Sequence, residues 1–413
     1  DIEGLGEETT YYVRGYAKVG DDYYYAATNV SFTTPVAIVA PTVTTTAATN
    51  VESTTATVGG SITNDGGGTI SAYGISYSTT DGFEGADGTL VEGSDLNEGE
   101  FTVSLTQLSG KTTYYVRAYA ENEIGRAYGE QVSFTTLPDG IVNGKAKFTI
   151  NAAGDQVYFS QGNLQYTKST QVWSFMEHQY DIVETEGQDV GTDYANQDVV
   201  SYFGWGTSGC NLRGTNTNYY YQPYNTNSSN AGSYYGPSGH HNLTGDYANG
   251  DWGVYNAISN GGNEVNQWRT FTRDEWVYVY ESRANHSQRY GHGKVNGVNG
   301  MILLPDVWTL PEGLTFTPGN SNWANQYTEM QWAMMQANGA VFLPAAGGRV
   351  GTQIIEWGEN GYYWSTSDYL SDFSYEPLYV RACRPKFSSN SIATTNQYYR
   401  NRGYPIRLVC PVE

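Results

Sequence analysis

A nine-residue segment occurs twice near the start of the chain. Residues 9–17 read TTYYVRGYA and residues 112–120 read TTYYVRAYA, and each copy is followed by a segment ending in SFTT, at Ser31–Thr34 and Ser133–Thr136. The copies lie about one hundred residues apart, which is the size of an immunoglobulin-like β-sandwich domain. The repeat therefore predicts tandem all-β modules in the first third of the chain.

The second copy carries the pattern of a complete module over residues 37–138. Leu108, Thr112 and Tyr114 have the spacing of a tyrosine corner, in which a tyrosine hydroxyl bonds back to the preceding turn. Alternation of apolar and polar residues predicts five strands: Thr42–Thr46, Thr55–Ile62, Ser71–Tyr77, Phe101–Leu105 and Tyr114–Ala120.

These strands and the tyrosine corner resemble the fibronectin type III module, in the form common on surface proteins of gut Bacteroidetes. Residues 1–36 retain only the last two strands of such a module, and two strands cannot cover a core alone. We therefore expect a trimmed or processed chain with further modules, and possible surface-assembly partners, upstream. The resemblance implies that the modules act as spacers.

Residues 139–413 differ in composition and predict one large domain. Strand-like runs open it at Lys145–Ile150 and Gln156–Tyr166, and residues 211–245, rich in Asn, Tyr, Gly and Ser, have no periodicity. A loop of that length in a compact domain is either functional or disordered.

The segment FTRDEWVYVYESR, residues 271–283, predicts a helix. Thr272 and Glu275 have the spacing of a capping box, which satisfies free N–H groups at a helix start. The residues that repeat at helical spacing are expected to face the core: Trp276, Val279, Tyr280 and Arg283.

The segment YTEMQWAMMQANG, residues 327–339, predicts a second helix. Thr328 and Gln331 form its capping box, and Gly339 ends it. Trp332 and Met335 are expected to face inward.

Six motifs now occur in a fixed order: FGWGTSG at 203–209, WRTFTRDEW at 268–276, VNGVNGMILLPDVW at 295–308, FLPAAGGR at 342–349, GYYWSTS at 361–367 and IRLV at 406–409. Together they resemble the major paralogous domain of Fibrobacter and Bacteroides surface proteins. That domain is related to the C-type lectin fold, in the variant shared with formylglycine-generating enzyme. The resemblance implies an α+β domain whose long loops carry function.

In some relatives the C-terminal segment is the variable region of a diversity-generating retroelement, and residues 371–402 have that composition. The predicted fold class is thus a multidomain chain, in which fibronectin type III-like sandwiches are followed by an α+β C-type lectin-like domain at residues 139–413.

The C-terminal segment, residues 361–411, also has the composition of a recognition surface. Tyrosine gives rigid contact area, Asn and Ser adapt their hydrogen bonds, and Arg offers forked donors. Strand alternation requires some of these tyrosines to pack inward. The candidate ligand-binding residues are Tyr369, Tyr375, Tyr379, Arg381, Arg384, Lys386, Asn396, Tyr398, Tyr399 and Arg400.

The chain is strongly acidic, with 42 acidic and 21 basic residues and a formal net charge of −21. A negative field repels nucleic acid and anionic membranes, so neither is expected as a general partner. No apolar run reaches the roughly eighteen residues of a membrane span. Basic residues nevertheless gather between Arg381 and Arg407, a stretch without Asp or Glu. This cluster is either a solvated face or a patch for an anionic ligand.

Three cysteines occur, Cys210, Cys383 and Cys410, which is too few for a disulfide scaffold. A Cys383–Cys410 bridge and buried free thiols are both open at this point. No cofactor is predicted. The resemblance allows a structural calcium ion, for which DYANGD at 246–251 offers oxygen ligands, but such clusters are also plain turns.

No enzymatic motif is complete. The close cysteine pair of formylglycine-generating enzymes is missing, and no zinc-binding histidine spacing occurs. A glycosidase needs two positioned carboxylates, and nothing in the sequence pairs the candidates: Asp251, Asp274, Glu275, Glu329 and Glu356.

We therefore expect a non-enzymatic, extracellular cell-surface protein, exported by a signal or anchor outside this sequence. Its C-terminal domain is predicted to bind a glycan or a host or neighbouring-cell protein. A structural subunit of a surface fibre or pilus tip is the alternative, and a glycan-active enzyme is a third.

Overall fold

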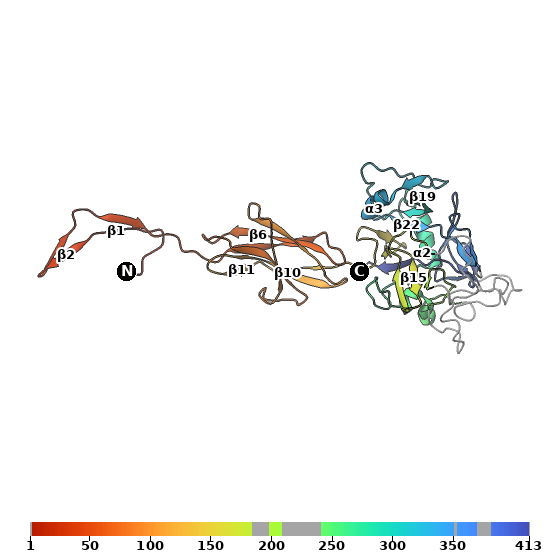
Figure 1. The fold of residues 1–413 in the computed structure, drawn as a ribbon, viewed down its shortest axis with the longest axis horizontal. Helices are drawn as coiled ribbons and strands as arrows, with labels where there is room; N and C mark the ends of the chain where they lie inside the picture. Colours follow the sequence, from red (N-terminus) through yellow and green to blue (C-terminus); the bar gives the residue numbers. More distant parts are fainter. Residues whose placement is uncertain (1, 184–197, 209–240, 351–352, 370–380, 413) are drawn as a thin grey trace. The chain divides into compact units, whose positions relative to one another are not determined.

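A computed structural model describes residues 2–183, 198–208, 241–350, 353–369 and 381–412. The chain divides into two compact units, Asp1–Leu137 and Pro138–Glu413 (Figure 1). The candidate site lies in the second unit.

The first 36 residues contain two paired stretches of antiparallel strand. Strand β1 (Thr10–Val13) pairs with β4 (Val30–Thr33), and β2 (Tyr16–Val19) pairs with β3 (Asp22–Tyr25). The chain reverses at Gly20, whose positive φ of 64° suits glycine. Most side chains of these strands are exposed.

Two sheets form the next module. One has the order β5-β6-β9, and the other has the order β11-β10-β7-β8, with β12 also paired to β10. The strands are β5 (Thr42–Thr49), β6 (Ala56–Asn64), β7 (Ala72–Ser78), β8 (Thr89–Glu92), β9 (Glu100–Leu105), β10 (Thr113–Glu121), β11 (Arg126–Tyr128) and β12 (Val132–Thr135).

Inward side chains from both sheets fill the core of this sandwich, as strand alternation predicts. Along β9 every second residue is buried, and Val58, Ile75 and Val116 are almost fully enclosed. The predicted tyrosine corner is confirmed, because the Ser109 amide donates to the Tyr114 hydroxyl at 2.9 Å.

The repeat in the sequence is also a repeat in strand pairing. Tyr11 faces Phe32 across β1 and β4, and Tyr114 faces Phe134 across β10 and β12. The Gly6 amide donates to the Tyr11 hydroxyl as Ser109 does to Tyr114. Residues 10–33 therefore repeat the strand pairing found at the C-terminal end of the complete sandwich.

Two four-stranded sheets organise the second unit. One has the order β13-β14-β31-β18, from β13 (Lys147–Thr149), β14 (Gln156–Phe159), β31 (Leu408–Pro411) and β18 (Arg269–Thr270). The other has the order β21-β19-β20-β22, from β21 (Asn325–Tyr327), β19 (Tyr290–Val295), β20 (Val298–Leu303) and β22 (Val341–Pro344). The pairing of β14 with β31 brings the two ends of the unit together.

Smaller sheets complete the unit. Strands β15 (Leu164–Thr167), β16 (Val172–Phe175) and β17 (Val199–Val200) form one sheet, and β23 (Gly348–Val350) pairs with β24 (Gln353–Ile355). Two further sheets carry the candidate site: β25-β28-β29, from β25 (Gly361–Tyr362), β28 (Lys386–Phe387) and β29 (Ile392–Ala393), and β26-β27-β30, from β26 (Asp368–Tyr369), β27 (Arg381–Cys383) and β30 (Gln397–Tyr399).

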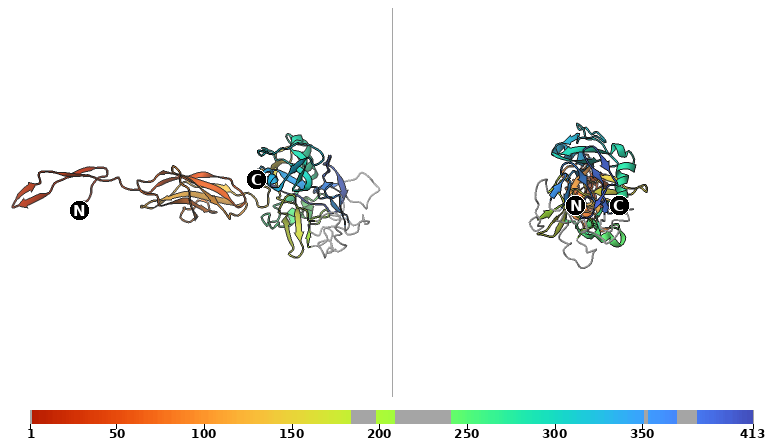
Figure 2. Two further views of the ribbon diagram at one scale, coloured as in Figure 1. Left: turned by 45° about the horizontal axis from the view of Figure 1, so that its top comes forward. Right: turned by 90° about the vertical axis from the view of Figure 1, so that its right-hand side faces the viewer.

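The two predicted helices are confirmed, including both capping boxes. Helix α2 (Arg273–Val277) follows Thr272 and continues as a π-helix, η4 (Tyr278–Ser282), while α3 (Glu329–Ala337) follows Thr328. The other helical turns are short: η3 (Gly245–Gly250), α1 (Trp252–Tyr255) and η5 (His286–Gln288). Figure 2 shows the ribbon of this unit from two further directions.

Buried aromatic side chains hold the second unit together. Trp276 packs edge-on against Phe271 with ring centres 4.7 Å apart, and Trp332 packs against Phe342 at 5.6 Å. Both tryptophans are buried, so the aromatic stripes of the two helices belong to the core as predicted.

Cys383 and Cys410 are both buried and are not bridged to each other, which excludes the Cys383–Cys410 disulfide. Cys210 lies outside the described residues. Among the described residues, no helix has the length and apolar character needed to cross a bilayer.

Candidate ligand-binding site

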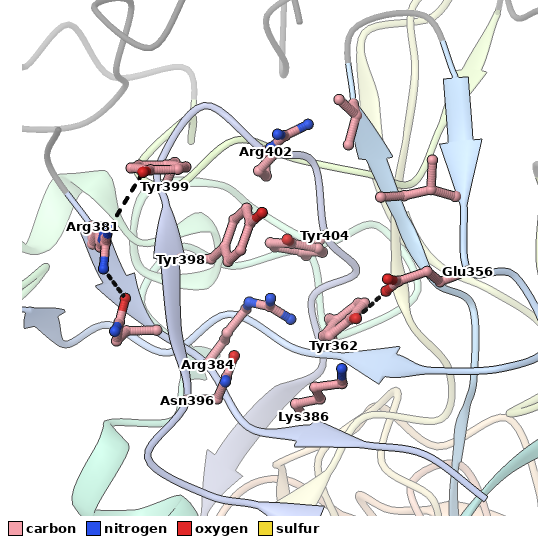
Figure 3. Close-up of a pocket in the computed structure, with 13 residues that line it drawn as sticks. Glu356, Tyr362, Arg381, Arg384, Lys386, Asn396, Tyr398, Tyr399, Arg402 and Tyr404 are labelled. Atoms are coloured by element: carbon pink, nitrogen blue, oxygen red, sulfur yellow. Dashed lines mark hydrogen bonds between the residues drawn. The ribbon is translucent and has the colours of Figure 1, made fainter.

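Strand pairing in the C-terminal segment builds one wall of a cavity. Strand β27 pairs with β26 and β30, so Arg381 lies beside Tyr399, while β28 pairs with β25 and brings Lys386 beside Tyr362. Glu356 follows β24 and faces this wall from the other side (Figure 3). Residues that are distant in sequence thus surround one space.

The cavity has a volume of about 410 Å³. That volume falls within the roughly 300–1,000 Å³ typical of small-molecule sites. Its lining is mainly polar, aromatic and cationic: Val350, Ile355, Glu356, Tyr362, Arg381, Arg384, Lys386, Asn396, Gln397, Tyr398, Tyr399, Arg402 and Tyr404.

Arg384 sits among three tyrosine rings. Its guanidinium carbon lies 3.8 Å from the ring centre of Tyr362, 4.3 Å from that of Tyr404 and 4.9 Å from that of Tyr398. The side chain is 4% exposed, and Nε and Nη1 have no hydrogen-bond partner among the described residues. The ring faces attract the charge, but they leave these N–H donors unused.

Three further cations line the cavity. Lys386 Nζ lies 5.5 Å from the Tyr362 ring centre, and the Arg402 guanidinium carbon lies 5.5 Å from that of Tyr398. Arg381 donates to Gln397 Oε1 at 3.2 Å and to the Tyr399 hydroxyl at 3.3 Å.

Glu356 is the one acidic residue among the described lining residues, and its carboxylate accepts a hydrogen bond from the Tyr362 hydroxyl. Four cations against one acid give the cavity a positive charge in a chain whose net charge is −21. Low-dielectric walls strengthen that local field.

Two tyrosines of the cavity, Tyr362 and Tyr404, remain protonated at neutral pH. Burial raises the pKa of Tyr404 to about 12, against a smaller opposing effect of Arg384. Burial, followed by the bond to Glu356, raises the pKa of Tyr362 as well. The rings therefore offer neutral faces and hydroxyl groups to a ligand.

Six of the ten residues predicted from the sequence meet in this cavity: Arg381, Arg384, Lys386, Asn396, Tyr398 and Tyr399. Tyr398 is the most exposed of the aromatic side chains there, at 37%. Tyr369 lies half-buried in β26 and does not line the cavity. Tyr375 and Tyr379 lie outside the described residues.

Arg400, predicted from the sequence as a ligand-binding residue, does not line the cavity. Its side chain is fully buried, with Nη2 2.5 Å from Asp368 Oδ1 and the guanidinium carbon 4.1 Å from the Trp205 ring centre. A guanidinium in that position supports the fold and does not reach a ligand in the cavity.

Sequence reasoning missed four lining residues that matter for the chemistry: Glu356, Tyr362, Arg402 and Tyr404. Arg402 belongs to the basic cluster between Arg381 and Arg407, so this cluster could have identified it as a candidate. Glu356 follows β24 and Tyr362 ends β25, and no local sequence pattern indicates that these strands face the C-terminal segment.

The other candidate residues have structural partners. Asp251, offered for calcium, accepts hydrogen bonds from the Thr270 amide and hydroxyl at 2.8 Å each, and its side chain caps α1. Glu275 binds Arg269 and the Thr272 amide. Within the described ranges, no group of three His, Cys, Asp or Glu side chains is placed to hold a metal ion.

The model of the fibronectin type III domain matches residues 40–135, and no curated protein matches the chain. Among solved structures, the fibronectin type III domain from the human KIAA0970 protein is 18% identical, with 23% of this chain and 72% of that chain covered and a TM-score of 0.18. Domains FN1–FN3 of chicken CNTN1 are 18% identical, with 33% and 46% covered and a TM-score of 0.20.

Domains d3–d4 of the rat CD45 extracellular region are 20% identical, with 33% of this chain and 68% of that chain covered and a TM-score of 0.21. Of the chicken CNTN1 fragment, the chain covers 46%, which is less than half of that fragment's length. The family match, the strands β5 to β12 and the tyrosine corner agree: residues 40–135 of this chain are a fibronectin type III domain.

Proposed function

We propose that this chain is a cell-surface ligand-binding or adhesion protein whose second unit binds a glycan or a protein in the Tyr- and Arg-lined cavity. Fibronectin type III domains are typical of extracellular adhesion or ligand-binding proteins, and residues 40–135 are such a domain. The domain is the spacer, and the second unit, proposed to be a C-type lectin-like domain on its six ordered motifs, is the head. The chain is exported and displayed outside the cell.

The observation that carries this proposal is the cavity itself. Aromatic faces, amide groups and cations converge on a space of about 410 Å³ in the segment that the sequence marked as a recognition surface. The candidate carboxylates Asp251 and Glu275 serve as a helix cap and an ion-pair partner, respectively. Recognition by a preformed site, with no chemical step, fits these groups best.

Glycan and protein arrays probed with the whole chain test the proposal. The wild type is compared with Tyr398→Ala and with a matched control, Tyr255→Ala, because Tyr255 in α1 is exposed to a similar extent (41% against 37%) and does not line the cavity. We expect hits that Tyr398→Ala loses and Tyr255→Ala keeps. An absence of hits, or equal loss in both variants, would contradict the proposal.

A second candidate function is assembly into a surface fibre. Strands β1 to β4 expose aromatic side chains, among them Tyr12 at 70% and Tyr16 at 63%. Exposed aromatic surface of this kind marks contact sites. Sedimentation at rising concentration decides: a monomer throughout argues against assembly, and concentration-dependent polymers that Tyr12→Ser and Tyr16→Ser abolish argue for it.

A further inference from the structure

We propose that the cavity holds a seat for the carboxylate or sulfate group of an acidic sugar, built around the guanidinium of Arg384. This inference rests on the proposed ligand-binding function and names the ligand class. Arg384 projects into the space bounded by Tyr362, Tyr398 and Tyr404 (Figure 3).

The first argument is the unmet bonding capacity of Arg384. A buried guanidinium normally has an acidic partner or a full set of acceptors, because desolvation of the charge is costly. Among the described residues, Arg384 has no salt-bridge partner, and its Nε and Nη1 have no acceptor. Three ring faces offset only part of the cost. A ligand anion would supply the acceptors that are missing and form charge-assisted hydrogen bonds.

The second argument is the charge around that guanidinium. Lys386 and Arg402 also line the cavity without an ion-pair partner among the described residues, and Arg402 Nε has no acceptor there. Glu356 accepts a hydrogen bond from the Tyr362 hydroxyl, and its single negative charge leaves the four cations of the lining in excess. Like charges held close together are stabilised when an anion enters between them.

The third argument concerns the rest of the ligand. Tyr398 presents a partly exposed ring on which a sugar can stack, and Asn396 Oδ1 is an acceptor without a partner in the described structure, suited to a sugar hydroxyl. A concave space of about 410 Å³ suits a saccharide unit better than the flat patch of a typical protein interface. The lining therefore favours an acidic glycan over an acidic protein surface.

Calorimetric titration of the whole chain with three probes tests this inference. The probes are a hyaluronan tetrasaccharide, which bears uronate carboxylates, the same tetrasaccharide with its carboxyl groups reduced to alcohols, and a sulfated neutral oligosaccharide. We expect at least one acidic probe to bind about tenfold to hundredfold more tightly than the reduced one, since a hydrogen bond to a charged group contributes about 1.5–3 kcal/mol. Which acidic probe binds separates carboxylate from sulfate.

Variants locate the seat. Arg384→Gln should weaken the acidic probe about tenfold or more and leave the reduced probe unchanged. Lys145→Gln is the control, because it removes one positive charge from an exposed position of the same unit. If the Arg384→Gln variant does not fold, the same titration of the Lys386→Gln variant tests the proposal. Lys386 is only half-buried, so its replacement should leave the fold intact.

The outcomes separate the two proposals. Equal affinity for the acidic and reduced probes overturns the anion seat and leaves glycan binding intact. Binding to an acidic protein but to neither acidic probe also overturns the seat. If no glycan and no protein binds, the proposed function itself fails.

Discussion

Arg400 Nη2 lies 2.5 Å from Asp368 Oδ1, and the two side chains are 0% and 6% exposed. This buried ion pair fastens the residue that follows β30 to β26. Within a short C-terminal segment, one arginine thus supports the fold while another, Arg384, lines the cavity.

Arg400→Ala should destabilise the second unit by about 3–5 kcal/mol, because it leaves Asp368 buried without this partner. Tyr398→Ala, two positions earlier, should cost less than about 1 kcal/mol, because that ring is partly exposed and packs at the cavity. Tryptophan fluorescence during urea unfolding measures both, since all ten tryptophans lie in residues 138–413. Equal losses in the two variants would refute the division of roles.

Trp276→Ala should destabilise the same unit by about 3–5 kcal/mol, since it empties a site enclosed by Phe271, Phe159 and Tyr280. Met330→Ala is the control, because Met330 is 80% exposed on α3 and its removal opens no cavity. The same fluorescence assay applies. A loss below about 1 kcal/mol would mean that Trp276 is not a core residue.

Tyr114→Phe should loosen the fibronectin type III domain locally. The Ser109 amide would lose its acceptor, at a cost of about 1–3 kcal/mol. Amide hydrogen exchange at Ser109 should accelerate correspondingly. Tyr115→Phe on the same strand serves as the comparison, and protection of Ser109 that survives in both variants would contradict the tyrosine corner.

The Cys383 thiol should react slowly in the folded chain. Burial raises its pKa to about 11 from an unfolded value of 9.0. The folded state therefore favours the neutral thiol, and this stabilisation is complete below pH 9 and is lost as the pH rises through about 11.

Alkylation with iodoacetamide, followed by peptide mass spectrometry, measures this reactivity. At pH 8.5 we expect about hundredfold slower labelling of Cys383 in the folded chain than in urea, from the thiolate populations alone. Comparable rates in the two states would show that the thiol is exposed.

Local patterns in the sequence predicted the local structure well. The capping boxes at Thr272 and Thr328 and the tyrosine corner at Tyr114 each join residues within five positions, so a single sequence contains all the necessary information. The fibronectin type III domain followed from the repeat together with the tyrosine corner.

The cavity was only partly predictable, because its walls come from distant strands. Residue type identified Arg384 and Tyr398, but the partner that buries Arg400 lies 32 positions away, at Asp368. From the sequence alone, a long charged side chain such as that of Arg400 is expected at the surface, because its buried partner is not known. Glu356 entered the site through the turn after β24, which composition does not reveal.

Residues that line the cavity are interspersed in the C-terminal segment with residues that hold its strands together. Lys386, Asn396, Tyr398 and Arg402 face the cavity, whereas Arg400 and Asp368 fasten the strands behind it. Ligand choice and thermodynamic robustness thus depend on different positions of one short stretch. If the proposed function holds, substitutions at the cavity positions would change the ligand that is bound and would leave the Arg400–Asp368 ion pair in place.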